Sequence, residues 1–399
     1  MSRLPRVGLP VWHRTLSLLL AGNRVHCVLI AAAFASAASL SFLNVAPNRL
    51  VSGIGVRLAP LLVGGRCWLI LPAVVLALAC FARPTRSRQA TTALAASLSL
   101  TGLLWLAGDE AQRLSAHLPG ASRVSLGGGF WALASSIWMA GLNAVQRLDL
   151  GSTRRTLIYV VMLLPALGLL FLGELDQLAL LKEYANRRDV FHAAWQRHLE
   201  ILLATLVPSL AAGIPLGIAA ARSDRFAAAL FAVLNVIQTV PSIALFGLLI
   251  VPLAWLAGVL PGWGIRGVGL LPAVIALTLY ALLPIVRGMA VGLRQVPAAV
   301  VEAAAGMGMT ARLLFWQVEL PLALPILLSS VRITVIQVVG LTVVAALIGA
   351  GGFGAIVFQG LAGSSLDQVM LGVLPVVALG IVADAGFRLM AAALEGRHR

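Results

Sequence analysis

The sequence predicts an all-α integral membrane protein with about ten transmembrane helices. Three observations support this prediction. Hydrophobic residues make up 60% of the 399 residues and charged residues only 11%, with a mean hydropathy of +0.98; soluble domains carry about 25% charged residues. Apolar runs long enough to span a bilayer recur along the chain. The arginines gather between these runs, where basic residues set the orientation of membrane helices. We therefore attribute the formal charge of +15 to membrane topology and not to nucleic-acid binding.

Residues 1–24 form a basic leader that is predicted to be cytoplasmic. The apolar run that follows, Val25–Ala46, is longer than the core of a secretory signal peptide, so we interpret it as an uncleaved first helix. Residues 25–173 are expected to form a block of about five transmembrane helices. After the first, these are Cys67–Ala82, Thr91–Gly108, Gly127–Val145 and Thr156–Gly173. Their loops contain no acid–base pair, so the sequence assigns this block no task.

Residues 174–198 differ from the rest of the chain because charged residues are frequent there. We expect an amphipathic helix on the extracytoplasmic membrane surface, linking the first block to the remainder. His192 and His198 lie six residues apart and do not share a helix face. We therefore expect solvated histidines, with no metal ion and no cofactor.

Residues 199–399 are predicted to form the core of the protein. The expected crossings are Leu199–Ala221, Phe226–Leu260, Val268–Val286, Ile326–Ala350 and Val369–Ala393. The second of these is too long for one straight crossing, and Pro241 and Pro252 would interrupt it. Two alternatives remain open, a kinked helix or a helix followed by a re-entrant segment.

A less apolar stretch, residues 297–325, separates two of these crossings. Pro297 suits the first turn of a helix, and Ala298–Ala305 is rich in strong helix formers. Gly306 and Gly308 are expected to end that helix. Thr310 can cap a second helix, Ala311–Glu319, which we expect Pro321 and Pro325 to stop. The resulting helix-turn-helix would lie outside the bilayer, with apolar side chains that need a partner surface.

Placing both termini in the cytoplasm puts most basic residues on the cytoplasmic side, and residues 297–325 with them. The chain contains a single lysine, Lys182, and no glycine-rich loop precedes it. A phosphate-binding loop of the G-x-x-x-x-G-K-[ST] type is therefore absent from the sequence. If transport is driven by ATP, the ATPase has to be another chain.

The same stretch resembles a known motif. Glu302-Ala303-Ala304, followed by Gly308 and then Leu320-Pro321, is similar to the EAA loop of bacterial ABC importer permeases. Further segments look like the permeases for glycine betaine and related osmoprotectants. Among them are Ile237-Gln-Thr-Val-Pro-Ser-Ile-Ala244 and Ile348-Gly-Ala-Gly-Gly-Phe-Gly354. The resemblance covers the chain from about Leu199 to its end and implies a core of the type I ABC importer permease fold.

The resemblance also implies a function. Glu302, Ala303, Ala304, Gly308, Leu320 and Pro321 would dock an ATP-binding subunit that hydrolyses ATP, so the chain itself would not be an enzyme. An extracytoplasmic substrate-binding protein and a second permease copy, or a similar subunit, are the other implied partners. The solute would be glycine betaine, choline or a similar compatible solute, carried across the bacterial cytoplasmic membrane.

Uncharged polar residues at membrane depth are the candidates for the path of the solute. They are Asn235, Gln238, Thr239 and Gln337. Simple hydrogen bonding between helices is the alternative explanation for each.

Charged residues inside predicted helices allow a second interpretation of the chain. An ion-gradient-driven secondary transporter or a channel would need a membrane-embedded carboxylate, and Asp384 is the candidate. Asp384 and Arg388 lie four residues apart and can pair on one helix. Arg332 is expected to reach toward the cytoplasmic face or to pair with a subunit. The G-x-G-x-x-G pattern formed by Gly349, Gly351 and Gly354 fits a tight turn with close helix packing better than a nucleotide site.

Overall fold

A computed structural model describes residues 23–48, 53–81, 85–117 and 122–397, so the basic leader falls outside the described residues. The chain is mainly helical and divides into two compact units, Met1–Lys182 and Glu183–Arg399. Each unit has hydrophobic clusters of its own.

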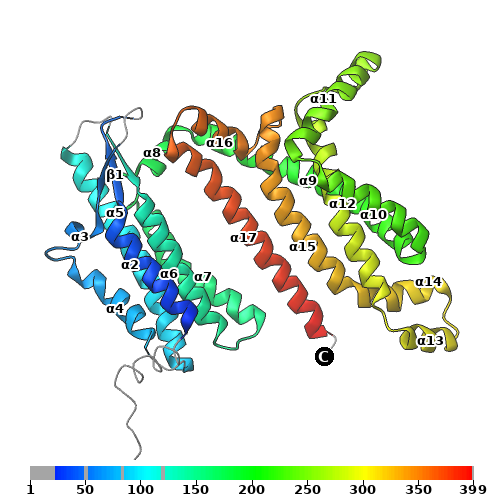
Figure 1. Ribbon diagram of the computed structural model, residues 1–399, viewed down its shortest axis with the longest axis horizontal. Helices are drawn as coiled ribbons and strands as arrows, with labels where there is room; N and C mark the ends of the chain where they lie inside the picture. Colours follow the sequence, from blue (N-terminus) through cyan, green and yellow to red (C-terminus); the bar gives the residue numbers. More distant parts are fainter. Residues whose placement is uncertain (1–22, 49–52, 82–84, 118–121, 398–399) are drawn as a thin grey trace, which may run out of the picture. The chain divides into compact units, whose positions relative to one another are not determined.

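Unit 1 is a helical bundle with a small sheet (Figure 1). Its helical elements are α2 (Arg24–Ser39), α3 (Leu58–Leu61), a 3-10 turn (Cys67–Leu69), α4 (Ile70–Ala79), α5 (Arg86–His117), α6 (Gly128–Gln146) and α7 (Ser152–Phe171). A short helix, α8 (Ala179–Asn186), lies across the boundary between the units. The expected first crossing is shorter than predicted, because α2 ends at Ser39 and the chain then enters a strand.

The sheet of unit 1 was not expected from the sequence. Strands β1 (Leu43–Ala46), β2 (Ile54–Val56) and β3 (Arg123–Leu126) pair in the order β2-β1-β3, and both pairs are antiparallel. Leu43 lies opposite Val56 on one side and Leu126 on the other. These strands have only three or four residues, too few for an alternating pattern to stand out within an apolar sequence.

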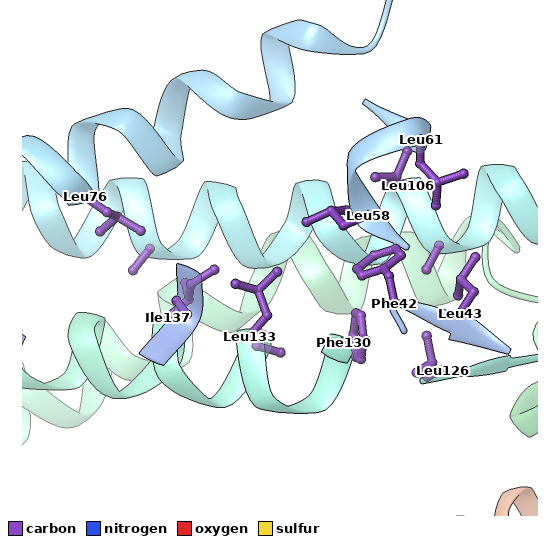
Figure 2. Packing of buried hydrophobic residues seen from close by; sticks show 14 of the residues in the cluster. Phe42, Leu43, Leu58, Leu61, Leu76, Leu106, Leu126, Phe130, Leu133 and Ile137 are labelled. Atoms are coloured by element: carbon purple, nitrogen blue, oxygen red, sulfur yellow. The ribbon is translucent and has the colours of Figure 1, made fainter. Parts of the chain in front are cut away.

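The sheet closes onto the bundle through an aromatic contact (Figure 2). The rings of Phe42 and Phe130 meet edge to face with centroids 5.7 Å apart, and both side chains are buried. Gly127 lets the backbone at Ser41 come close to the start of α6, because a Cβ added to Gly127 would lie 2.2 Å from the Ser41 carbonyl oxygen. Unit 1 thus has a packed core of its own around α5 and α6.

Unit 2 contains the predicted transport core. Its helical elements are α9 (Arg188–Arg222), α10 (Asp224–Thr239), α11 (Ser242–Val259), a 3-10 turn (Pro261–Trp263), α12 (Leu270–Arg294), α13 (Ala298–Gly306), α14 (Ala311–Leu314), a π turn (Phe315–Glu319), α15 (Leu320–Ala345), a 3-10 turn (Ala346–Ile348), α16 (Phe353–Ala362) and α17 (Leu366–Arg397). Helix α9 starts before the expected boundary at residue 199 and crosses it without a break.

Helix α12 packs closely against both α9 and α15 because glycine lines the two contacts. A Cβ added to Gly217 of α9 would lie 2.8 Å from the carbonyl oxygen of Val286. On the other side, a Cβ on Gly288 would lie 2.0 Å from the Ser330 hydroxyl. Small residues let helix backbones approach in a membrane, where packing, rather than water exclusion, holds helices together. These three helices therefore form the centre of unit 2.

Of the four prolines expected to interrupt helices, Pro241 does so, whereas the helices continue through the other three. Residues 226–260 separate at Pro241 into α10 and α11, whereas Pro252 lies inside α11. Pro321 and Pro325 do not stop the second loop helix, since α14 continues through the π turn into α15. The Leu320 amide donates to the Phe315 carbonyl five residues before it, which is the hydrogen-bond spacing of a π turn. Pro321 follows in the first turn of α15, where a missing N–H is tolerated, and Pro325 lies inside that helix.

Seven helices in the described part of the chain are long and apolar enough to cross a membrane. They are α5, α7, α9, α11, α12, the continuous helix Ala311–Ile348 and α17. Three shorter apolar helices accompany them, α2, Cys67–Ala79 and α16. The other crossings expected from the sequence fall on α2, on Cys67–Ala79 and on α6, whereas no crossing was expected at α16. The expected crossing Phe226–Leu260 is divided between α10 and α11.

Candidate functional site

The first arm of the loop between α12 and α15 is helix α13. It begins after Pro297 and gives way to a turn at Gly308, whose φ of +83° favours glycine. In that turn the Gly308 amide donates to the Ala305 carbonyl at 2.9 Å, and the Met309 amide donates to the Ala304 carbonyl at 3.3 Å. Gly308 therefore sets the angle between the two arms.

The second arm begins at Thr310, whose hydroxyl accepts a hydrogen bond from the Leu313 amide, as expected. The two arms leave apolar side chains exposed. The exposed fractions are 40% for Val300, 73% for Met307, 41% for Leu313 and 59% for Trp316. Among the residues of α13 only Ala304 is buried.

The structure places the predicted docking residues on this loop in three environments. Glu302, Ala303 and Gly308 are exposed, Ala304 is buried, and Leu320 and Pro321 are half-buried at the start of α15. Figure 1 shows α13 and α14 at the end of unit 2 opposite α11 and α16. An exposed apolar surface of this kind is typical of a contact with another chain.

Both ends of the loop are tied to the junction between α9 and α10. Before the loop, an Nη2 of Arg294 donates to the Ala220 carbonyl and to Asp224, each at 2.8 Å. After the loop, Glu319 is buried and forms an ion pair with Arg222. The sequence did not predict these contacts, because the paired residues lie 70 to 97 residues apart in the chain. No local sequence pattern indicates pairs at such a separation. A force on the loop would therefore reach α9 and α10.

A cavity of about 380 Å³ opens between α10, α12 and α15. We call it the polar cavity. Its lining residues are Gln238, Leu283, Pro284, Arg287, Gly288, Val291, Ile326, Ser330, Ile333 and Gln337. This volume lies within the usual range of small-molecule sites, roughly 300–1,000 Å³.

The polar cavity brings together two of the four predicted path residues, Gln238 and Gln337. The Gln238 amide nitrogen donates to the Tyr280 carbonyl at 2.8 Å. Asn235 lies nearby, since its side-chain oxygen accepts from Arg287 at 3.3 Å. Thr239 is not part of the lining, and its hydroxyl donates to the Val236 carbonyl of its own helix.

Arg287 is a lining residue that was not predicted from the sequence. The expected crossing ended at Val286, but α12 continues to Arg294 and carries Arg287 on the face of the cavity. The guanidinium carbon lies 5.8 Å from the centre of the Phe231 ring. The signal was available in the sequence, because Arg287-Gly-Met-Ala-Val-Gly-Leu293 continues the helical spacing of apolar residues.

Asp384 of α17 is held between two arginines. One carboxylate oxygen accepts from the Nε of Arg332 at 2.5 Å, and the other accepts from the Nε of Arg388 at 2.8 Å. Arg332 therefore pairs with another helix, and the expected pair with Arg388 is confirmed. Both carboxylate oxygens are therefore already occupied by guanidinium groups, which weakens the support for an ion-coupled transporter.

Replacing Asp384 by asparagine is expected to destabilise unit 2, because two arginines at the α15–α17 contact lose their common counter-ion. The side chains are between a quarter and a half exposed, so we expect about 1–2 kcal/mol, between the values for surface and buried pairs. Asp224→Asn is the control, since that carboxylate is 91% exposed. Equal melting temperatures of the two purified variants would contradict this role.

The glycine-rich segment after α15 forms a tight turn, as expected. Gly349 and Gly351 have φ values of +78° and +88°. A Cβ on Gly354 would lie 2.0 Å from the Val343 carbonyl oxygen, so this glycine permits close packing. His198 is fully buried against the Phe353 ring, which corrects the expectation of a solvated histidine, whereas His192 is exposed.

Comparisons with known proteins connect this geometry to a family. Residues 213–398 match the family described as the binding-protein-dependent transport system inner membrane component. The chain is 39% identical to the osmoprotectant import permease protein OsmW of Salmonella typhimurium, over 49% of this chain and 84% of that protein. This chain belongs to the ABC importer permease family. It is therefore a multi-pass transport component of the inner membrane and not an enzyme, and the family implies ATPase and substrate-binding partners.

Other relatives of this permease are also named as permease proteins of transport systems. It is 36% identical to the carnitine transport permease protein OpuCB of Listeria monocytogenes, over 50% of this chain and 85% of that protein. It is 35% identical to the glycine betaine/carnitine/choline transport system permease protein OpuCB of Bacillus subtilis, over 47% of this chain and 80% of that protein. Residues 23–181 match a separate family, the N-terminal domain of the ABC transporter permease YehY.

A solved structure is also similar to part of this permease. An inward-facing form of the MetNI methionine ABC transporter gives a TM-score of 0.48 at 23% identity, over 52% of this chain and 98% of that one.

Proposed function

We propose that this permease moves a compatible solute such as glycine betaine or choline across the bacterial inner membrane, energised by a separate ATPase subunit. Relatives named for osmoprotectants, carnitine, glycine betaine and choline support the solute class. The observation that carries the proposal is the loop between α12 and α15, because it exposes Val300, Met307, Leu313 and Trp316 at one end of unit 2.

In this proposal α13 and α14 dock into the ATPase, with Glu302, Ala303, Ala304 and Gly308 in the docking surface and Leu320-Pro321 at its base. When the ATPase closes, the loop moves with it. The contacts of Arg294 and Glu319 carry that movement to the α9–α10 junction. Because Gln238 lies on α10 and lines the polar cavity, a shift of α10 changes the shape of the cavity.

The polar cavity is proposed as part of the solute path. Its walls come from three helices of one chain. A solute that crosses the membrane needs to be enclosed, so a second copy of the permease, or a similar subunit, would supply the opposite wall. The extracytoplasmic binding protein would deliver the solute to this pair.

The proposed orientation places the loop in the cytoplasm, where ATP is. The C-terminal end of α17 lies at the same end of unit 2 as α13 and α14 (Figure 1). The C-terminus would then be cytoplasmic, and the excess of basic residues on that side favours the same orientation for the N-terminus.

Labelling of single cysteines tests both docking and orientation. After replacement of Cys27, Cys67 and Cys80, we expect Met307→Cys to react with a membrane-impermeant thiol reagent only from the cytoplasmic side. The bound ATPase should protect it. Trp263→Cys is the control, because Trp263 is 77% exposed and lies in the turn that follows α11. Helix α11 lies at the end of unit 2 opposite α13 and α14 (Figure 1). Labelling of position 307 from outside the cell, or no protection by the ATPase, would contradict the proposal.

Unit 1 is proposed to be an accessory block of membrane helices, with residues 174–198 as a surface linker. A chain that begins at Glu174 is expected to insert and to keep ATP-dependent uptake, because unit 2 has hydrophobic clusters of its own. The measurements are membrane yield and the initial rate of uptake, compared with Gly308→Val in the full chain. Loss of insertion in the shortened chain would show that unit 1 is needed by the core.

A further inference from the structure

Arg287 carries a positive charge in the polar cavity that no acidic side chain of the described residues neutralises. Its nearest polar partner is the uncharged Asn235, and its guanidinium lies over the ring of Phe231. Three other arginines of unit 2 are paired with carboxylates, Arg222 with Glu319, Arg294 with Asp224 and Arg332 with Asp384. Arg287 therefore differs from these three.

The position of Arg287 makes an unneutralised charge costly. Helix α12 is long and apolar enough to span the membrane, and Arg287 lies about two turns before its end. Charged residues within membrane helices are rare, and they face cavities or partners where they act on a substrate or an ion. Arg287 is exposed and faces a cavity. An anionic group of a bound molecule would supply the missing counter-charge.

The other lining groups restrict what that molecule can be. The cavity offers the amides of Gln238 and Gln337 and aliphatic surface from Leu283 and Ile333, and none of its lining residues is acidic. The side chain of Gln337 makes no hydrogen bond within the described chain. Amide oxygens and aliphatic carbons can surround a quaternary ammonium group, which donates no hydrogen bond, whereas a purely cationic solute would be repelled by the guanidinium.

We propose that Arg287 determines the charge selectivity of this permease by binding the carboxylate of a zwitterionic solute in the polar cavity. This inference rests on the proposed function, because it assumes that the solute passes through the cavity. Guanidinium groups bind carboxylates through two parallel hydrogen bonds, which fixes the orientation of the solute as well as its charge. A zwitterion with a carboxylate is favoured, and a cation of the same size without one is disfavoured.

Glycine betaine and choline form a matched pair of probes, because both carry a trimethylammonium group and only glycine betaine carries a carboxylate. The experiment uses the full-length permease reconstituted in proteoliposomes with its ATPase and binding protein. It compares Arg287→Gln and Arg287→Lys with the unchanged chain. The control is Arg225→Gln, which removes an exposed arginine outside the cavity. Initial uptake of each solute and ATP hydrolysis are measured together.

We expect Arg287→Gln to lower the ratio of glycine betaine uptake to choline uptake by about tenfold or more, the effect of losing one charge-assisted contact. ATP hydrolysis should change less than about twofold, and Arg287→Lys should keep most of the selectivity. Arg225→Gln should behave like the unchanged chain.

Two results would overturn the inference alone. An unchanged ratio in Arg287→Gln would show that Arg287 does not act on the solute. An equal loss of uptake of both solutes would indicate a contact with a partner chain instead. If the unchanged importer takes up no solute in an ATP-dependent way, the proposed function itself fails, and this inference fails with it.

Discussion

Replacement of Gly308 by valine is expected to abolish ATP-dependent uptake and binding of the ATPase, while insertion into the membrane stays normal. Gly308 has a φ of +83°, in the left-handed region. A residue with a side chain loses about 1–2 kcal/mol there, and a β-branched one loses more. The turn between α13 and α14 would relax into another conformation, and the two arms would no longer fit the ATPase together. Co-purification of the ATPase with the tagged permease measures this loss.

Two variants separate the turn from general effects on the loop. Gly308→Asn should retain much of the binding, because asparagine tolerates the left-handed region better than other residues with side chains. Gly306→Val changes a glycine in the last turn of α13, where φ is not positive and nothing lies within 4 Å of an added Cβ. Normal ATPase binding by Gly308→Val, or equal loss in Gly306→Val, would show that the turn angle is not what the ATPase recognises.

Replacement of Glu319 by glutamine is expected to separate ATP hydrolysis from transport. Glu319 is the buried last residue of the π turn and forms an ion pair with Arg222 at the end of α9. The variant keeps the shape of the side chain and removes the charge that ties the loop to α9. We expect the number of solute molecules moved per ATP to fall by about tenfold, within the usual range of coupling free energies, while the ATPase still co-purifies.

The exchange of both charges is the control for this pair. Arg222→Glu and Glu319→Arg are each expected to impair coupling, and the double variant is expected to recover part of it, because opposite charges again meet. Recovery in the double variant measures the interaction itself and excludes independent damage at each site. Unchanged transport per ATP in Glu319→Gln would mean that movement reaches α9 and α10 by another contact.

Local patterns in the sequence predicted much of the loop. The capping role of Thr310, the turn at Gly308 and the start of the first arm after Pro297 each depend on a few neighbouring residues. Such features follow from side-chain chemistry and glycine geometry, so the sequence contains them in full. The class of the protein also followed from the sequence, through composition and the spacing of the motif around Glu302.

The contacts between distant segments could not be predicted in this way. Arg222 and Glu319 meet because α9 and α15 both pack against α12. No local sequence pattern indicates this packing. The role of Arg287 was missed because the end of α12 was placed too early. The second arm of the loop continues through a π turn into α15, although Pro321 and Pro325 were expected to stop it. The ends of helices and the contacts between distant residues are therefore the features that the structure shows and the sequence did not predict.

The central claim is that a separate ATPase drives this permease through the loop between α12 and α15. The most direct test is uptake of glycine betaine into proteoliposomes that contain the purified permease and binding protein, with and without the ATPase, at a fixed concentration of ATP. We expect uptake only when both the ATPase and ATP are present, and none for Gly308→Val. Uptake by the permease without the ATPase, at a rate equal to that of the complete importer, would contradict it.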